Sequence, residues 1–231
     1  MLSIASASLS FAGVATPVAM RASPVVMQSK EELATALNPA IGYYDPLGLA
    51  SADFWSQGND ATYGFLRQAE IKHGRVAMFA FCGYIAQANG IHFPYILGET
   101  TSGATPEEQW FNLPVEGRAQ IIGFIGFLEF WGEYGGKHYM RGGRPGEYPT
   151  FEEIPAGFVP FPKLNLYDPF GIAAKDSADK KAKGLLAEIN NGRLAMIGIM
   201  GFVSESHLTG SVPALTGLVK PFAGDVMAPL V

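Results

Sequence analysis

The sequence predicts an all-α membrane protein with three transmembrane helices and a short amphipathic helix near the C-terminus. Three segments, at about residues 63–89, 115–134 and 183–208, each contain an apolar core of about 16 to 20 residues, which is near the length that crosses a bilayer. Glycine is abundant, at 28 of 231 residues, and only 16% of the residues are charged. Both values are more typical of membrane helices than of soluble ones.

Residues 1–28 are predicted to be an organelle targeting leader rather than part of the fold. This segment is rich in Ser and Ala, and it contains one basic residue, Arg21, and no acidic residue. Transit segments have this composition, although the uncharged run at 2–20 is also compatible with a secretory signal peptide or a disordered terminus. Residues 29–231 are then expected to form a single three-helix domain.

The first and third predicted helices contain two copies of one motif. Glu70 to Ala80 reads E-I-K-H-G-R-V-A-M-F-A, and Glu188 to Gly198 reads E-I-N-N-G-R-L-A-M-I-G. Six of the eleven positions are identical at an offset of 118 residues, and they include Glu, Gly and Arg, which ordinary apolar helices avoid. The motif therefore indicates an internal duplication.

Within each copy the arginine follows the glutamate by five residues. Because a helix turns roughly 100° per residue, the arginine points roughly 140° away from its own glutamate, and the two do not pair easily. If the helices cross face to face, each glutamate meets the arginine of the other copy, and a glycine in each copy lets the backbones approach. The predicted pairs are Glu70 with Arg193 and Glu188 with Arg75, and the glycines are Gly74 and Gly192. The duplication thus predicts a crossed pseudo-two-fold pair of helices.

The segments outside the helices carry two further signals. Asp45-Pro46 and Asp168-Pro169 precede the two repeat helices within the related sequences D-P-L-G and D-P-F-G, which have turn chemistry. The loop at 91–113 contains no Lys or Arg, whereas the loop at 138–183 contains seven. By the positive-inside rule, the second loop stays on the side of the membrane from which the protein is synthesised or imported, and the first loop is translocated to the other side. The short helix is expected at 212–222.

The second predicted helix carries Gln120 and Glu129 within an apolar run. Ionisable residues in membrane spans cost about 2.5 to 3.5 kcal/mol on insertion scales and usually mark function. A transporter or proton relay would use Glu70, His73, Glu129 and Glu188 as a connected polar path. An enzyme would need a converging nucleophile and base, and the sequence offers no such set. A pigment protein would use separate Lewis bases, each facing outward to ligate one macrocycle.

The spacing favours the pigment protein. A glutamate that is neutralised by arginine keeps a second oxygen for Mg²⁺, a hard ion that accepts oxygen and nitrogen donors. His73 and Asn191, each three residues after a repeat glutamate, are neutral ligands that need no counter-ion. The alternative interpretation is that the Glu–Arg pairs only tie the helices together and that His73 and Asn191 only pack or form hydrogen bonds.

These motifs, with the Q-I-I-G-F-I-G-F-L-E helix, resemble the chlorophyll-binding light-harvesting antenna family over about residues 40–210. The second helix and the long loop after it are most similar to the fucoxanthin or peridinin chlorophyll a/c proteins of secondary-plastid algae. The resemblance implies two carotenoids, with ends near Asp45-Pro46 and Asp168-Pro169, and no metal other than chlorophyll Mg. The implied ligands of that Mg are Glu70, His73, Gln120, Glu129, Glu188 and Asn191, with Glu205 or His207 as the last ligand on the third helix.

The resemblance further implies a non-enzymatic antenna that binds chlorophyll a, chlorophyll c and carotenoids of the fucoxanthin or peridinin and diadinoxanthin types. Such a protein passes excitation energy to a photosystem I or II core, alongside other antenna subunits and thylakoid lipids. In the plastid thylakoid membrane, the N-terminus and the 2–3 loop would be stromal, and the 1–2 loop and the C-terminus lumenal. The net charge of −5 does not favour nucleic-acid binding. The alternatives are a photoprotective, energy-dissipating member of the family and, outside it, a small membrane transporter.

Overall fold

The structure, a computed structural model, describes residues 30–91, 105–149, 170 and 175–224. The predicted leader at 1–28 lies outside these residues. The chain divides into two units, residues 1–44 and residues 45–231. Within the first unit, helix α1 (Lys30–Leu37) has Glu31 and Glu32 in its first turn and buries Leu33. Acidic residues in a first turn complement the partial positive charge of a helix N-terminus, so this short helix begins where its sequence favours it.

The second unit is helical, and the part of it that the structure describes contains no strand. Its long helices are α2 (Asn59–Ala88), α5 (Val115–Tyr134) and α6 (Ala178–His207), and each begins at, or up to five residues before, the predicted start. The short elements are η1 (Leu49–Ser51), α4 (Pro106–Asn112) and η2 (Tyr139–Arg141). The all-α class is therefore confirmed for the described residues. Among those residues, no helix is both long and apolar enough to be identified as a membrane span.

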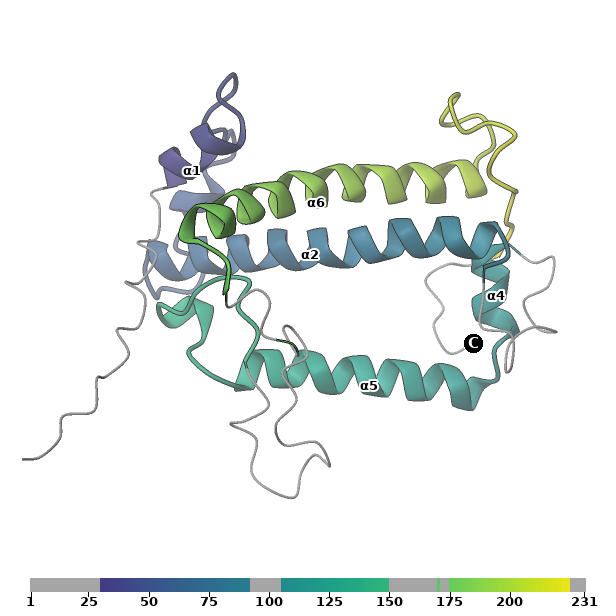
Figure 1. Ribbon diagram of the computed structural model, residues 1–231, viewed down its shortest axis with the longest axis horizontal. Coiled ribbons are helices and arrows are strands. Elements are labelled where there is room, and N and C mark those ends of the chain that lie inside the picture. Colours follow the sequence, from purple (N-terminus) through teal and green to yellow (C-terminus); the bar gives the residue numbers. More distant parts are fainter. Residues whose placement is uncertain (1–29, 92–104, 150–169, 171–174, 225–231) are drawn as a thin grey trace, which may run out of the picture. The chain divides into compact units, whose positions relative to one another are not determined.

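Helices α2 and α6 lie side by side and run in the same direction (Figure 1). Their contact buries equivalent positions of the two motif copies, namely Ile71 and Ile189, Gly74 and Gly192, and Ala77 and Ala195. Farther along the pair, Phe81 stacks on Phe202 with ring centroids 5.1 Å apart. Because equivalent positions of the repeated motif are buried on both helices, the two helices form the predicted pseudo-two-fold pair.

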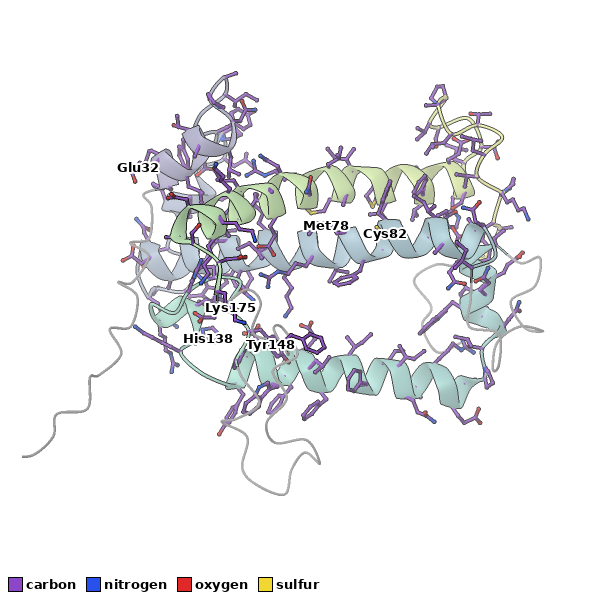
Figure 2. The ribbon with its side chains drawn as sticks, viewed as in Figure 1. Glu32, Met78, Cys82, His138, Tyr148 and Lys175 are labelled. Atoms are coloured by element: carbon purple, nitrogen blue, oxygen red, sulfur yellow. The ribbon has the colours of Figure 1, made fainter. Side chains whose placement is uncertain are left out.

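The segment that follows α5 packs against α2. The N–H of Gly146 donates to Gln68 Oε1 at 2.6 Å, and Arg75 Nη1 donates to the Gly146 carbonyl at 2.7 Å. Tyr148 lies beside α5 (Figure 2), where its hydroxyl donates to the Leu128 carbonyl at 2.8 Å. This segment therefore connects the C-terminal half of α5 to the middle of α2.

Helix α4 was not among the predicted elements, because its sequence lies in the loop expected at 91–113. Thr105 starts it with a capping box: the Thr105 side chain accepts from the Glu108 N–H at 3.2 Å, and the Thr105 N–H donates to Glu108 at 2.9 Å. Pro106 follows at the first helical position, where its missing N–H costs nothing. The T-P-E-E sequence was thus a start signal that could have predicted the helix.

The prediction of a short helix at 212–222 is wrong. This segment forms successive turns, with hydrogen bonds from the Leu215 N–H to the Val212 carbonyl at 2.8 Å and from the Leu218 N–H to the Leu215 carbonyl at 2.9 Å. Gly217 has φ +82°, which lies outside the right-handed helical region. The turns of this segment therefore do not continue into a helix.

Candidate functional site

Two reciprocal ion pairs join α2 and α6. Arg75 Nε lies 2.5 Å from Glu188 Oε1, and Arg193 reaches Glu70 Oε1 through Nη2 at 2.7 Å and Nε at 2.8 Å. These are the cross-paired partners that the repeat predicts. Each arginine therefore neutralises a glutamate of the other helix.

The two backbones touch between these ion pairs. A Cβ atom added to Gly192 would lie 2.9 Å from the Cα of Gly74, and one added to Gly74 would lie 3.0 Å from the Cα of Gly192. Glycine at both positions therefore lets the two helix backbones approach closely. At this separation, each arginine can reach a glutamate of the other helix.

Glu70 has a second cation that the repeat does not predict. Arg67, one turn earlier on α2 and only 11% exposed at its side chain, pairs with Glu70 Oε2. The equivalent residue before Glu188 is Leu185, and within the described residues Glu188 Oε2 has no hydrogen-bond partner. The expectation that each glutamate keeps one oxygen without a partner is therefore met by Glu188 and is wrong for Glu70.

His73 and Asn191 lie on the exposed surfaces of α2 and α6. The His73 Nδ1 is 2.8 Å from the carbonyl oxygen of Ala69, one turn earlier, and a donor at Nδ1 leaves Nε2 as the lone-pair nitrogen. Histidines that ligate metals usually have this arrangement, in which the second ring nitrogen is held by a carbonyl or carboxylate. The donor set of an oriented imidazole, an exposed amide and a neutralised carboxylate therefore fits the Mg²⁺ of chlorophyll.

Beyond these predicted ligands, exposed apolar side chains continue along both helices at equivalent positions. Phe79 is 82% exposed on α2 and Ile197 is 73% exposed on α6, with Val76 and Leu194 one turn before them at 61% and 69%. Isolated exposed apolar residues are common on proteins, but stripes that repeat on two related helices indicate surfaces that bind something apolar.

The predicted ligands on α5 are both exposed, and they differ in their partners. Gln120 lies near the start of the helix, whereas Glu129 forms an ion pair with Lys72 of α2. One turn later, Glu133 accepts a hydrogen bond from the Tyr139 hydroxyl at 2.9 Å, and it lies 3.0 Å from His138 Nε2. Burial and this hydrogen bond raise the pKa of Tyr139 to about 12, so the hydroxyl remains a donor at neutral pH.

The two candidate ligands at the end of α6 have different environments. Glu205 is 1% exposed, and its carboxylate accepts from the Gly210 N–H at 2.9 Å and from the Val212 N–H at 2.8 Å. His207 is exposed. Glu205 therefore holds the turns that follow α6, and the geometry favours His207 as a ligand that a pigment can reach.

Only one of the two predicted carotenoid-end turns can be examined. Asp45 accepts from the Leu49 and Ala50 N–H groups at 3.0 Å each, which makes a turn around Pro46 and starts η1. The corresponding Asp168 and Pro169 lie outside the described residues.

Sequence reasoning missed three residues around the site. Arg67 is three residues before Glu70, a spacing at which opposite charges pair on a helix, and this signal could have revealed it. Lys72 and Gly146 make contacts with distant elements, and no local pattern indicates such partners.

The chain is similar to known proteins of one family. The family model described as "Chlorophyll A-B binding protein" matches residues 29–207. The chain is 31% identical over 221 residues to fucoxanthin-chlorophyll a-c binding protein A of Phaeodactylum tricornutum, which covers 88% of this chain and 99% of the relative. It is 33% identical to the fucoxanthin-chlorophyll a-c binding protein of Trieres chinensis, over 76% of this chain and 78% of the relative. It is also 31% identical to fucoxanthin-chlorophyll a-c binding protein F of Macrocystis pyrifera, over 86% of this chain and 85% of the relative.

Proposed function

Because the chain belongs to the chlorophyll a–b binding protein family, we propose that it is a light-harvesting antenna protein of the fucoxanthin chlorophyll a/c type. Its cofactors are chlorophyll a, chlorophyll c and carotenoids. When bound, these pigments absorb light and exchange excitation energy. The chain's own residues fix the spacing and orientation of the pigments, so that excitation passes toward a photosystem.

The observation that carries this proposal is one donor on each repeat helix, the half-buried carboxylate of Glu188 and the exposed imidazole of His73. Glu188 has one oxygen on Arg75 and the other available, and His73 presents Nε2 from an orientation set by Ala69. Each donor is held in place before a pigment binds, and none brings an uncompensated charge. The full proposed set of chlorophyll ligands is Glu70, His73, Gln120, Glu129, Glu188, Asn191 and His207. At Glu70, a pigment would share a carboxylate oxygen with an arginine, because both oxygens are already paired.

Carotenoids are proposed to lie along the exposed apolar stripes of the helix pair. Val76 and Phe79 line one stripe, and Leu194 and Ile197 line the other. Long apolar polyenes would cover these side chains, and their polar ends would reach the Asp45-Pro46 turn and its counterpart at 168–169.

We further propose that α2, α5 and α6 span the thylakoid membrane of the plastid, with residues 1–28 removed as a leader. The N-terminus and the 2–3 loop would be stromal, and the 1–2 loop and the C-terminus lumenal. The cross-paired charges support this arrangement, because a neutral pair costs far less in an apolar medium than a single charge. The relatives are named as chloroplastic proteins, which agrees with the location. The partners would be a photosystem core and other antenna subunits.

An absorption spectrum of the purified protein, with pigment extraction, tests the function. Chlorophyll a, chlorophyll c and a fucoxanthin-type carotenoid are expected at fixed ratios to the polypeptide. Carotenoid excitation should produce chlorophyll fluorescence, since harvested energy must move between pigments. A colourless purified protein would contradict the proposal. Pigments with strongly quenched fluorescence would instead support an energy-dissipating member of the family.

A further inference from the structure

Lys72 is a charged residue of α2 that the internal duplication does not explain. It lies inside the repeated motif, but the equivalent residue of the second copy is Asn190. Lys72 Nζ pairs with Glu129 Oε2 of α5 and lies 3.8 Å from Glu133 Oε1. The lysine is thus present on the one repeat helix that pairs with α5, and its charge is directed to the carboxylates of that helix.

Of these two carboxylates, Glu129 is the one that depends on Lys72. Glu133 already has the Tyr139 hydroxyl at 2.9 Å and His138 Nε2 at 3.0 Å. Within the described residues, Lys72 is the polar partner of Glu129. If the lysine were absent, Glu133 would keep its partners, and Glu129 would have no ion-pair partner among the residues that the structure describes.

The fold brings Glu129 to Lys72 through the segment after α5. Gly146 is held by Gln68 and Arg75 of α2, and Tyr148 donates to the Leu128 carbonyl, one residue before Glu129. These contacts link the C-terminal half of α5 to the middle of α2 through that segment. The ion pair therefore lies close to a connection that other hydrogen bonds already make between the two helices.

Three carboxylates of the helices now share one feature: each is paired with a cation from a different helix, and Glu70 has Arg67 of its own helix in addition. The pairs are Glu70 with Arg193, Glu188 with Arg75, and Glu129 with Lys72. We propose that Lys72 is the counter-ion that would keep Glu129 charge-neutral as a ligand for chlorophyll, an inference that rests on the proposed function of Glu129. Lys72 is thus a positioning residue that acts through Glu129.

The physical reason is the cost of a lone carboxylate in an apolar medium. Without a cation, the charge of such a group is uncompensated, and burying it beside a pigment costs far more than burying a neutral ion pair. An amide at the same position carries no charge and needs no cation, as Gln120 illustrates on the same helix. Loss of Lys72 should therefore be corrected by changing Glu129 to glutamine.

The test uses the full chain refolded in detergent with chlorophyll a and fucoxanthin, followed by pigment extraction and counting of chlorophyll per polypeptide. Lys72→Met should lose one chlorophyll per chain, and Lys72→Arg should lose none. Lys72→Met with Glu129→Gln should recover the lost chlorophyll, although it cannot rebuild the ion pair. Lys181→Met is the matched control, because Lys181 is exposed and is not one of the residues paired with Glu129 or Glu133. It should keep the full number of chlorophylls per polypeptide.

Three outcomes would overturn the inference. A full count in Lys72→Met alone would show that Glu129 needs no counter-ion. A loss that Glu129→Gln does not recover would show that Lys72 only docks α5 on α2. A full count in Lys72→Met with Glu129→Leu would show that Glu129 holds no chlorophyll, and in that case the proposed role of Glu129 fails. If that last variant loses one chlorophyll while Lys72→Met loses none, the role of Glu129 stands and only the inference about Lys72 is wrong.

Discussion

Arg75→Leu is expected to destabilise the pigment-loaded protein more than Arg193→Leu, although the two arginines occupy equivalent positions in the duplication. Arg75 makes two contacts, to Glu188 at 2.5 Å and to the Gly146 carbonyl at 2.7 Å. Arg193 pairs with Glu70, which also holds Arg67. Only the first substitution leaves a carboxylate without any cation.

The magnitudes follow from these contacts. Removing one partner of a buried ion pair costs about 3 to 5 kcal/mol. The side chains of Arg75 and Glu188 are 38% and 27% exposed, and solvent screening reduces this cost to about 2 kcal/mol. The Gly146 carbonyl loses its donor, which adds about 1 kcal/mol. We therefore expect about 3 kcal/mol for Arg75→Leu and about 1 kcal/mol for Arg193→Leu, where Arg67 remains.

The assay is thermal unfolding of the refolded pigment complex, followed by the loss of energy transfer from carotenoid to chlorophyll. For a chain of this size, the midpoint should fall by about 6 to 12 °C in Arg75→Leu and by about 2 to 4 °C in Arg193→Leu. Adding Glu188→Gln to Arg75→Leu should recover part of the loss, because the amide needs no cation. Adding Glu70→Gln instead should recover nothing, because Glu188 stays unpaired and Arg193 loses its partner.

Two results would refute this reasoning. Equal shifts for the two single variants would contradict the role given to Arg67. Equal rescue by the two double variants would contradict the functional importance of cross-pairing between the helices.

Three further predictions concern single sites. His73→Leu should lose one chlorophyll per chain with an unchanged far-ultraviolet circular dichroism spectrum, and an unchanged pigment count would make His73 a packing residue. Gly192→Ala should cost about 1 to 3 kcal/mol in thermal unfolding, because its Cβ would lie 2.9 Å from the Cα of Gly74; a wild-type midpoint would contradict the close contact. His207→Leu should lose one chlorophyll and keep the thermal midpoint, whereas Glu205→Leu should lower the midpoint and first release the turns after α6. The reverse result would make Glu205 the ligand.

The contact between α2 and α6 could be predicted from the sequence because the motif that forms it occurs twice. One copy of the motif contains a glutamate and an arginine that cannot pair with each other, and the second copy supplies the missing partners. Reciprocal pairing follows without any distance information, and the structure places Arg75 on Glu188 and Arg193 on Glu70. The ligand roles of His73 and Asn191 remain predictions, supported by their exposure on the outer surfaces.

The features that could not be predicted are those outside the duplication. Lys72 lies in the middle of α2, and no local pattern in the sequence indicates its partner on α5. Gly146 follows a proline in a loop whose sequence says nothing about a contact with Arg75. The turns after α6 depend on the carboxylate of Glu205, which satisfies the N–H groups of Gly210 and Val212. In each case the partner is distant or belongs to an irregular segment, where hydrophobic periodicity carries no information.

The contact between Gly74 and Gly192 also limits where pigments could bind on this molecule. With 2.9 Å between one Cα and a Cβ position on the opposite helix, no flat ring can enter between the two backbones at that level. Chromophores that bind beside this contact would therefore lie on the outer faces of the helix pair. On these faces, the absorbing rings would come closer to the rings of an adjacent subunit than the two helix pairs come to each other. Exchange of excitation between neighbouring subunits would then depend on how their surfaces meet.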